Sequence, residues 1–152
     1  MIKIICIGSI KEKYLKDAIE EYTKRLNKYD KVEIIELKDE GKVEEFKSIE
    51  IEADKILKQI KEKEFIITLE VEGKEITSLE LANKISKTFI EHNTITFIIG
   101  GSYGLSDRIK NISNFHLSFS KMTFPHQLFR VILLEQIYRA YKINNNERYH
   151  KW

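Results

Sequence analysis

Three short stretches of this chain carry the residue types from which a functional site could be built. Gly100–Gly104 is a glycine-rich turn that directly follows the apolar run Thr94–Ile99. Ser120–Pro125 is an irregular loop that follows a second strand-like run, Phe115–Phe119. The polar segment Arg148–His150 offers a cation, an aromatic ring and an imidazole, which suit a phosphate contact, base stacking and proton transfer. Because ligands bind at the carboxyl ends of strands in open α/β sheets, the two loops predict a ligand site.

The glycine turn differs from the two common phosphate-binding motifs. A dinucleotide-binding turn needs G-x-G-x-x-G after the first strand and an acidic residue about 20 positions later. Here the glycines come late in the chain and have a different spacing. A Walker loop is excluded because no Gly-Lys-Ser/Thr follows. The adjacent Gly100 and Gly101 instead let the backbone approach a ligand closely, or simply form a turn.

The histidines and the single cysteine do not predict a metal site. None of the four histidines lies at metal-ligand spacing from another histidine, the cysteine or a carboxylate. We interpret His116 as a strand residue that faces solvent, and His126, directly after Pro125, as structural. Cys6 lies inside an apolar run and is predicted to be a small buried hydrophobe.

Charge is distributed unevenly along the chain. The net charge is +2, but residues 1–100 carry 18 basic and 21 acidic side chains, whereas residues 101–152 carry 8 and 3. A basic C-terminal third is typical of a surface that binds a polyanion, and is also compatible with ordinary variation in surface charge. The side chains that could meet phosphates are Arg108, Lys110, Lys121, Arg130, Arg139 and Lys142.

Hydrophobic spacing predicts the elements that hold these segments in place. Buried or alternating runs predict strands at Ile2–Ile7, Val32–Leu37, Phe65–Val71, Thr94–Ile99 and Phe115–Phe119. Helical spacing predicts helices near residues 14–29, 42–63, 77–89, 106–113 and 125–141, the third opened by a capping box at Thr77 and the fourth capped by Ser106. This alternation predicts an α/β fold, a mostly parallel sheet with helices on both faces, but leaves the strand order open. The last ten residues are predicted to form an extended tail.

Length and hydropathy predict one cytoplasmic domain. A chain of 152 residues can bury its own core, and we expect residues 1–152 to form a single domain. There is no apolar run near the roughly 20 residues that a membrane helix needs, and no signal-peptide pattern at the start.

Four segments together resemble a known family. They are Ile99–Gly104, Leu117–His126, Arg130 with Glu135–Ala140, and Tyr149–Lys151. In these segments the chain is similar to the family of ribosomal RNA large-subunit methyltransferase H, in the SPOUT superfamily. The resemblance covers essentially the whole chain. Two departures are a region around residues 38–50 that is short for the family and Trp152, which extends past the usual ending.

The resemblance implies a fold feature and a cofactor. SPOUT enzymes tie their C-terminal part into a trefoil knot, which gathers loops around S-adenosylmethionine. Carried over position by position, the cofactor-binding residues are Leu69, Gly100, Gly101, Ser120, Lys121, Met122, Thr123, Phe124 and Pro125. Among these, Leu69, Met122 and Phe124 can supply apolar walls.

The resemblance also implies a reaction and its partners. The reaction is methylation at N3 of a pseudouridine in 23S ribosomal RNA, carried out on the assembled ribosome. The tail of one subunit is expected to complete the site of the other in a homodimer, with His150 as the candidate base and Tyr149 and Arg148 as positioning groups. Surplus apolar residues in the final helix also favour a dimer: Val131, Ile132, Leu133, Leu134, Ile137 and Tyr138.

Two other functions remain open from the sequence. One is a non-catalytic α/β module of the same fold that binds nucleotides or RNA. The other is a small flavodoxin-like protein, although the phosphate loop expected after the first strand is missing.

Overall fold

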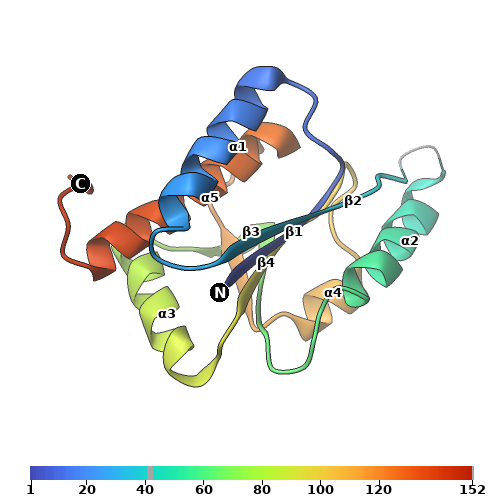
Figure 1. Ribbon diagram of the computed structural model, residues 1–152. Helices are drawn as coiled ribbons and strands as arrows, with labels where there is room; N and C mark the ends of the chain where they lie inside the picture. The colour runs from blue at the N-terminus through green and yellow to red at the C-terminus, as the bar shows by residue number, and fades with distance from the viewer. Residues whose placement is uncertain (41–42, 152) are drawn as a thin grey trace.

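The computed structural model describes residues 1–40 and 43–151, which form alternating strands and helices (Figure 1). The elements are β1 (Ile2–Ile7), α1 (Lys13–Leu26), β2 (Val32–Leu37), α2 (Glu45–Leu57), β3 (Phe65–Glu75), α3 (Ser78–Glu91), β4 (Ile95–Ile99), α4 (Asp107–Ile112), β5 (Phe115–Ser118) and α5 (His126–Asn144). The start predicted for the second helix at residue 42, and the terminal Trp152, lie outside the described residues.

The five strands form one sheet in the order β2-β1-β4-β3-β5, and every pairing is parallel. Two of the three inner strands, β1 and β4, are buried along their whole length, which explains their nearly continuous apolar sequences. Cys6, in β1, is fully buried as predicted, and burial raises the pKa of its thiol to about 11. The predicted α/β class and parallel sheet are confirmed.

Helices cover both faces of the sheet (Figure 1). The larger core lies under α1, α3 and α5, where Ile4 and Cys6 of β1 point. The opposite core lies under α2 and α4, where Ile5 and Ile7 point. This alternation is the period of two that a strand imposes on its side chains. Within the described part of the chain, no helix is long and apolar enough to cross a membrane.

Most predicted element ends are confirmed to within a few residues. Thr77 and Glu80 form the predicted capping box at the start of α3, and the Ser106 hydroxyl accepts a hydrogen bond from the Arg108 N–H at the start of α4. Pro125 stands directly before α5, so the last helix begins at its predicted position.

Two element ends differ from the prediction. Helix α2 ends at Leu57, and the chain turns through Lys63, whose φ of 70° is incompatible with a helix. Strand β3 runs past Val71 to Glu75, because the chain bulges after Leu69 and pairs with β5 again at Lys74. The bulge brings Gly73 so close to β5 that a Cβ there would lie 2.8 Å from the His116 carbonyl oxygen. Only glycine allows this second pairing.

The last helix ties the two edges of the sheet together. After edge strand β5, the chain crosses the carboxyl ends of the strands and enters α5. There the buried Arg130 donates to the Glu36 carboxylate at 2.6 Å and to the Gly8 carbonyl at 3.2 Å. Because Glu36 lies in the opposite edge strand β2, the segment 119–125 is held across the top of the sheet.

Candidate functional site

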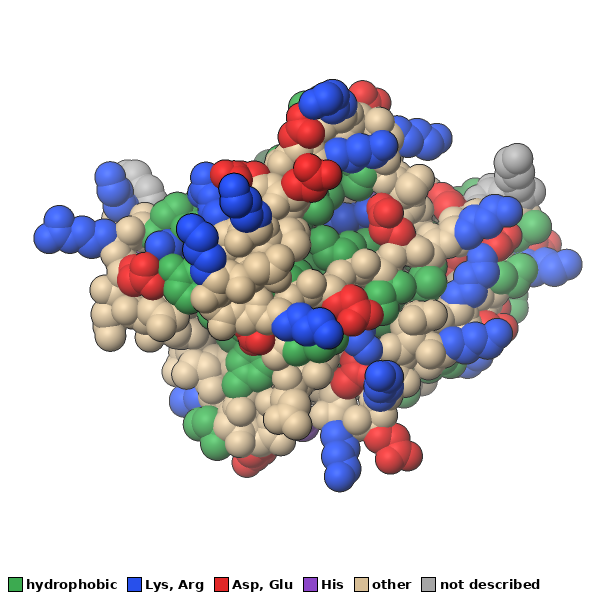
Figure 2. Space-filling view, in the orientation of Figure 1, with side chains coloured by type: hydrophobic (Ala, Val, Ile, Leu, Met, Phe, Trp, Pro, Cys, Tyr) green, Lys and Arg blue, Asp and Glu red, His purple; other side chains and the backbone are tan. Residues whose placement is uncertain are grey.

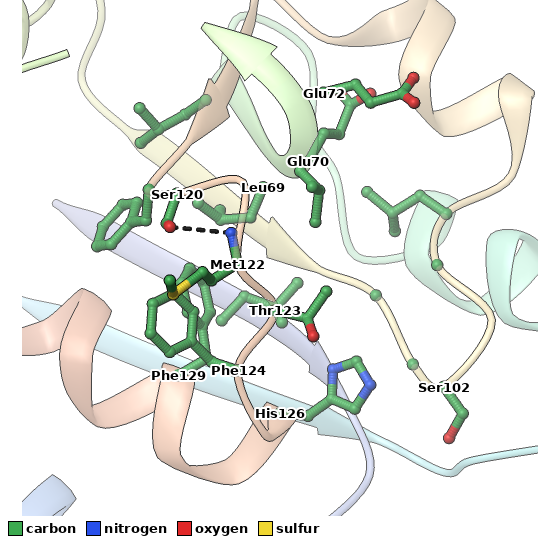
Figure 3. A pocket seen from close by; sticks show the side chains of 18 of the residues that line it. Leu69, Glu70, Glu72, Ser102, Ser120, Met122, Thr123, Phe124, His126 and Phe129 are labelled. Atoms are coloured by element: carbon green, nitrogen blue, oxygen red, sulfur yellow. Dashed lines mark hydrogen bonds between the residues drawn. The ribbon is translucent and has the colours of Figure 1, made fainter. Parts of the chain in front are cut away.

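A cavity of about 510 Å³ lies at the carboxyl ends of β4 and β5 and beside the bulge in β3 (Figure 3). This volume lies within the range of about 300–1,000 Å³ that is usual for small-molecule sites. Three segments form its walls: the bulge of β3 at residues 69–72, the glycine turn after β4, and the loop between β5 and α5. The structure therefore brings together both loops that the sequence singled out.

Most of the residues predicted to bind the cofactor line this cavity, and two do not. The lining residues among them are Leu69, Gly100, Gly101, Ser120, Met122, Thr123 and Phe124. Lys121 and Pro125 belong to the same loop but are not among the lining residues. That these nine residues bind the cofactor remains a prediction.

The glycine turn closes on itself. The Gly104 N–H donates to the Gly101 carbonyl at 3.1 Å, and Gly104 has a φ of 85°. A Cβ on Gly100 would lie 2.7 Å from the Gly104 carbonyl oxygen, whereas one on Gly101 would meet the side chains of Ile7 and Glu52 at 3.0 and 3.2 Å. The first glycine is thus needed for the turn's own closure, and the second for its packing on the structure beneath.

A buried carboxyl group supports this turn from below. Glu52 of α2 is 4% exposed and accepts hydrogen bonds from the Glu40 N–H at 3.1 Å and the Ser48 hydroxyl at 3.4 Å. Burial is the main reason why the pKa of Glu52 is raised above its ordinary value, and the negative charge of Asp39 adds to this effect. The turn therefore rests on a carboxyl group whose ionisation is made less favourable by its burial.

The loop before α5 forms the apolar wall of the cavity. The Ser120 hydroxyl accepts from the Met122 N–H at 3.0 Å, which fixes the start of the loop. The Phe124 ring stacks on Phe129 of α5 with ring centres 5.8 Å apart, and Phe119 meets the same ring edge-on at 5.0 Å. Figure 3 shows Leu69, Met122 and this aromatic pair on the same side of the cavity.

Sequence reasoning missed several cavity residues. His126, interpreted as structural, lies at the cavity mouth between Thr123 and Ser102 (Figure 3). Its position directly after the loop, in the first turn of a helix, was the available signal. The aromatic lining residue Phe129, in α5, was also missed. The remaining missed lining residues are Glu70, Val71, Glu72, Ile99, Leu105, Leu117 and Phe119, whereas Ser102 and Gly104 belong to the predicted glycine turn and Lys110 was predicted to contact phosphate.

A polar cluster lies beside the cavity between β3, β5 and the end of α4. The Thr68 hydroxyl is 2.6 Å from the Glu70 carboxylate and 2.7 Å from the Ser113 hydroxyl. The His116 imidazole contacts the same Glu70 carboxylate. His116 is exposed, as predicted, but it is also engaged in this pair. The cluster fixes the strand end that carries Leu69.

Comparison with known proteins identifies the family. The family model described as "Predicted SPOUT methyltransferase" matches residues 1–150. The chain belongs to the SPOUT methyltransferase family.

Relatives of this SPOUT chain are similar over their full length. A protein from Methanococcus maripaludis is 59% identical over 157 residues, covering 99% of each chain. Proteins named ribosomal RNA large subunit methyltransferase H from Clostridium tetani and Clostridioides difficile are each 53% identical over 157 residues, again covering 99% of each chain. A solved structure, described as a probable methylase family protein from Haemophilus influenzae, matches with a TM-score of 0.58 at 14% identity, covering 99% of this chain and 70% of that one. This last likeness supports the fold alone.

The C-terminal tail of this SPOUT chain is packed against its own last helix. The Tyr149 ring meets Tyr138 edge-on, with centres 4.9 Å apart, and stands over the Arg139 guanidinium at 4.9 Å. The expectation of an extended tail with no apolar surface to join is therefore wrong. Arg139 lies ten residues beyond the cavity residue Phe129, on the order of 15 Å along the helix. The tail thus lies away from the cavity of its own chain.

Most of the basic residues expected to meet phosphates are held in internal ion pairs. Arg108 pairs with Glu50 and Asp54, Arg130 with Glu36, Arg139 with Glu135, and Lys142 with Glu147. In the tail, Arg148 and Lys151 are exposed, as is Lys121 of the cavity loop. Figure 2 shows basic side chains at the end of the molecule that carries the C-terminus, and others spread over the rest of the same view. In residues 1–40 and 43–151, no group of three or more His, Cys, Asp or Glu is placed to hold a metal ion.

Proposed function

We propose that this chain is an S-adenosylmethionine-dependent methyltransferase that methylates N3 of a pseudouridine in 23S ribosomal RNA. One observation carries the proposal: in a SPOUT family chain, the β3 bulge, the glycine turn and the loop before α5 surround one cavity of small-molecule size. Its full-length relatives bear the name of a large-subunit ribosomal RNA methyltransferase. We propose the assembled ribosome as substrate and hence the cytoplasm as the place of action.

The cavity is proposed to hold S-adenosylmethionine. Leu69, Met122 and Phe124 would contact the adenine, because they form its apolar walls. Backbone groups of Gly100 and Gly101 and of the loop Ser120–Pro125 would supply hydrogen bonds, since these segments have backbone at the cavity surface. Lys121 and Pro125 would act by shaping that loop. The cofactor supplies an activated methyl group, and the chain supplies proximity and orientation.

We further propose that residues 1–152 form one domain whose C-terminal part is knotted. The path from edge strand β5 across the sheet to α5 is the segment that a trefoil knot would thread. Stretching the chain by its two ends in an optical trap tests this directly. A knotted chain unfolds to a shorter final length than its residue count allows, whereas an unknotted chain reaches full extension.

The active unit is proposed to be a homodimer. Of the apolar residues in α5 that suggested a dimer, Leu133, Leu134, Ile137 and Tyr138 are buried within the chain itself. Other apolar side chains remain exposed close to the cavity or on the outer face of α5, namely Met122, Phe124 and Leu128, while Val131 and Ile132 are half-buried. These would pair with a second copy around a two-fold axis.

A dimer would also bring the tail to a cavity. Because the tail lies away from the cavity of its own chain, Arg148, Tyr149 and His150 can be catalytic only at the cavity of a partner. There Arg148 would meet a phosphate and Tyr149 would stack on a base, with His150 at the target nucleotide. The arrangement makes two chains necessary for each reaction.

Two measurements test the proposed function. Calorimetry should show S-adenosylmethionine binding to the purified protein, and 70S ribosomes that lack the modification should gain a methyl group from labelled cofactor. Truncation after Ile143 should leave cofactor affinity nearly unchanged and abolish methylation, while His150→Ala should slow single-turnover transfer by roughly a hundredfold. Cofactor binding without methylation of ribosomes would favour the non-catalytic module. No cofactor binding would refute the assignment of the cavity.

A further inference from the structure

A half-buried contact network holds His150 against α5. Arg139 donates to the Glu135 carboxylate from Nε at 2.8 Å and also through Nη2, so its guanidinium is fixed in the plane of that carboxylate. A further nitrogen of the same group, Nη1, lies 3.1 Å from Nδ1 of His150. Tyr149 covers the face of the guanidinium. One arginine thus contacts two of the proposed functional side chains of the tail, Tyr149 and His150.

The contact between Arg139 and His150 determines which ring nitrogen carries the proton. A guanidinium has only donors and is always protonated, so Nδ1 of His150 must be the acceptor. The imidazole in this contact is therefore neutral, with its proton on Nε2. The lone pair of Nδ1 is occupied by the hydrogen bond from Arg139, and Nε2 already carries a proton. In this arrangement His150 is a hydrogen-bond donor and cannot act as a base.

The donor at Nε2 lacks an acceptor. Nε2 of His150 is inaccessible to water and has no hydrogen-bond partner within the described part of the chain. A buried N–H without an acceptor is unfavourable, and this cost is recovered when the tail shifts at the partner's cavity so that an acceptor reaches the N–H. A carbonyl oxygen is the simplest such acceptor. The uracil ring of a pseudouridine has carbonyl groups on both sides of N3.

We infer that His150 donates its Nε2 hydrogen to a carbonyl oxygen next to N3 of the target base in the partner's cavity, and that Arg139, fixed by Glu135, is the positioning residue that sets this tautomer. The inference rests on the proposed function, and it replaces the expected role of His150 as a base. Tyr149 remains a neutral stacking ring, because burial raises the pKa of its hydroxyl.

The methyl transfer then balances without a protein base. The N3–H bond breaks and its proton passes to water at the open cavity mouth, while the negative charge spreads onto the carbonyl oxygen that His150 stabilises. The N3 electron pair forms a bond to the methyl carbon. The bond between that carbon and sulfur breaks, and its electron pair stays on sulfur, giving S-adenosylhomocysteine. A donor aimed at developing charge contributes on the order of a hundredfold to a thousandfold in rate.

Substitutions of His150 separate a donor from a base. The side-chain amide N–H of glutamine can replace the Nε2–H of histidine, but an amide cannot accept the proton. His150→Gln should therefore retain single-turnover methylation of 70S ribosomes within about tenfold of wild type, whereas His150→Ala loses roughly a hundredfold or more. The wild-type rate should keep rising above about pH 6.5, the ordinary pKa of histidine, because ionisation of N3–H limits it. A base would give a plateau there.

Nitrogen NMR of the histidine side chains tests the role of Arg139 independently of activity. The wild-type protein should show His150 protonated on Nε2, and Arg139→Ala should lose this tautomer and slow methylation without changing cofactor affinity. Arg139→Lys, which retains a donor, should restore part of both. The matched control is Arg25→Ala, because Arg25 stands over Tyr22 and Tyr138 of the same aromatic cluster, at 5.3 and 5.6 Å, whereas the hydrogen bond to His150 comes from Arg139.

The outcomes distinguish the inference from the function on which it rests. If wild-type protein fails to methylate ribosomes, the proposed function fails, whatever the NMR spectrum shows. If wild type is active but His150→Gln is as slow as His150→Ala, or if the proton of His150 is found on Nδ1, the inference is overturned.

Discussion

Replacing Lys3 by methionine should strongly destabilise this protein. Lys3 interrupts the apolar run of β1 and is 4% exposed. Its ammonium lies 2.8 and 3.1 Å from the two oxygens of the Glu64 carboxylate and donates to the Gln59 carbonyl at 2.8 Å. Thr96 also donates to Glu64, at 2.6 Å. The pair is therefore a closed network beneath the amino ends of the inner strands, far from the cavity.

The size of the effect follows from the charge left behind. Lys3→Met leaves the Glu64 carboxylate buried without its cation, which costs about 3–5 kcal/mol. For a chain of this size, each kcal/mol lowers the melting temperature by about 2–4 °C, so a loss of roughly 6–20 °C is expected. The double variant Lys3→Met with Glu64→Met removes both charges, and should regain most of this stability.

The pH dependence gives a second check on the same pair. Burial by itself would raise the pKa of Glu64, but hydrogen bonds from Lys3, Thr96 and Lys61 outweigh it and hold the pKa below its ordinary value. A lowered pKa contributes stability above about pH 4.3, and that contribution is lost as the pH falls through the folded-state pKa. Urea unfolding at neutral pH and near pH 3 should thus show a large difference between wild type and Lys3→Met that shrinks in acid. A single variant no less stable than the double variant at neutral pH would refute this reasoning.

Three further predictions concern residues that support the cavity walls. Gly101→Val should abolish S-adenosylmethionine binding in calorimetry while leaving the circular dichroism spectrum native, because its Cβ would press on Ile7 and Glu52 beneath the turn; normal binding would contradict the site. Gly73→Ala should cost about 1–3 kcal/mol in urea unfolding, since the added Cβ meets backbone of β5 that cannot move aside; an unchanged midpoint would show that the bulge is adaptable. Glu52→Gln should gain stability relative to wild type as the pH rises above about 4.3, because a raised folded-state pKa makes ionisation of the acid unfavourable. If the difference in unfolding free energy between Glu52→Gln and wild type stayed constant from pH 4 to 8, ionisation of Glu52 would not affect stability.

Local sequence patterns were sufficient to predict where most strands of the sheet begin and end. The ends of β1 and β2 coincide with the prediction because charged or glycine residues bound each apolar run. The far end of β3 could not be predicted, because Gly73 indicates a turn locally and the second pairing with β5 depends on a contact more than 40 residues away. The end of α2 was missed because Ile60 continues the helical spacing beyond Leu57.

The parts of the site that are formed by one continuous segment could be predicted from the sequence. The glycine turn and the loop before α5 each contain their own signal. The tail was harder, because its packing depends on a chain reversal after α5. Asn146 makes that reversal with a φ of 56°, a conformation in which asparagine is common at helix ends. The three consecutive asparagines at 144–146 were the available signal, and they place Tyr149 back on Tyr138.

The contacts of Arg130 bear on how the protein is made. Its two partners, Glu36 and Gly8, precede it by 94 and 122 residues, so the top of the sheet cannot close until α5 has left the ribosome. Until then, the core face of β1 and β4 that α5 covers stays open to water. A chain grows at about 5–20 residues per second, and such long-range parallel pairings form slowly. Folding should therefore wait for nearly complete synthesis, and chains interrupted before α5 should aggregate or be degraded.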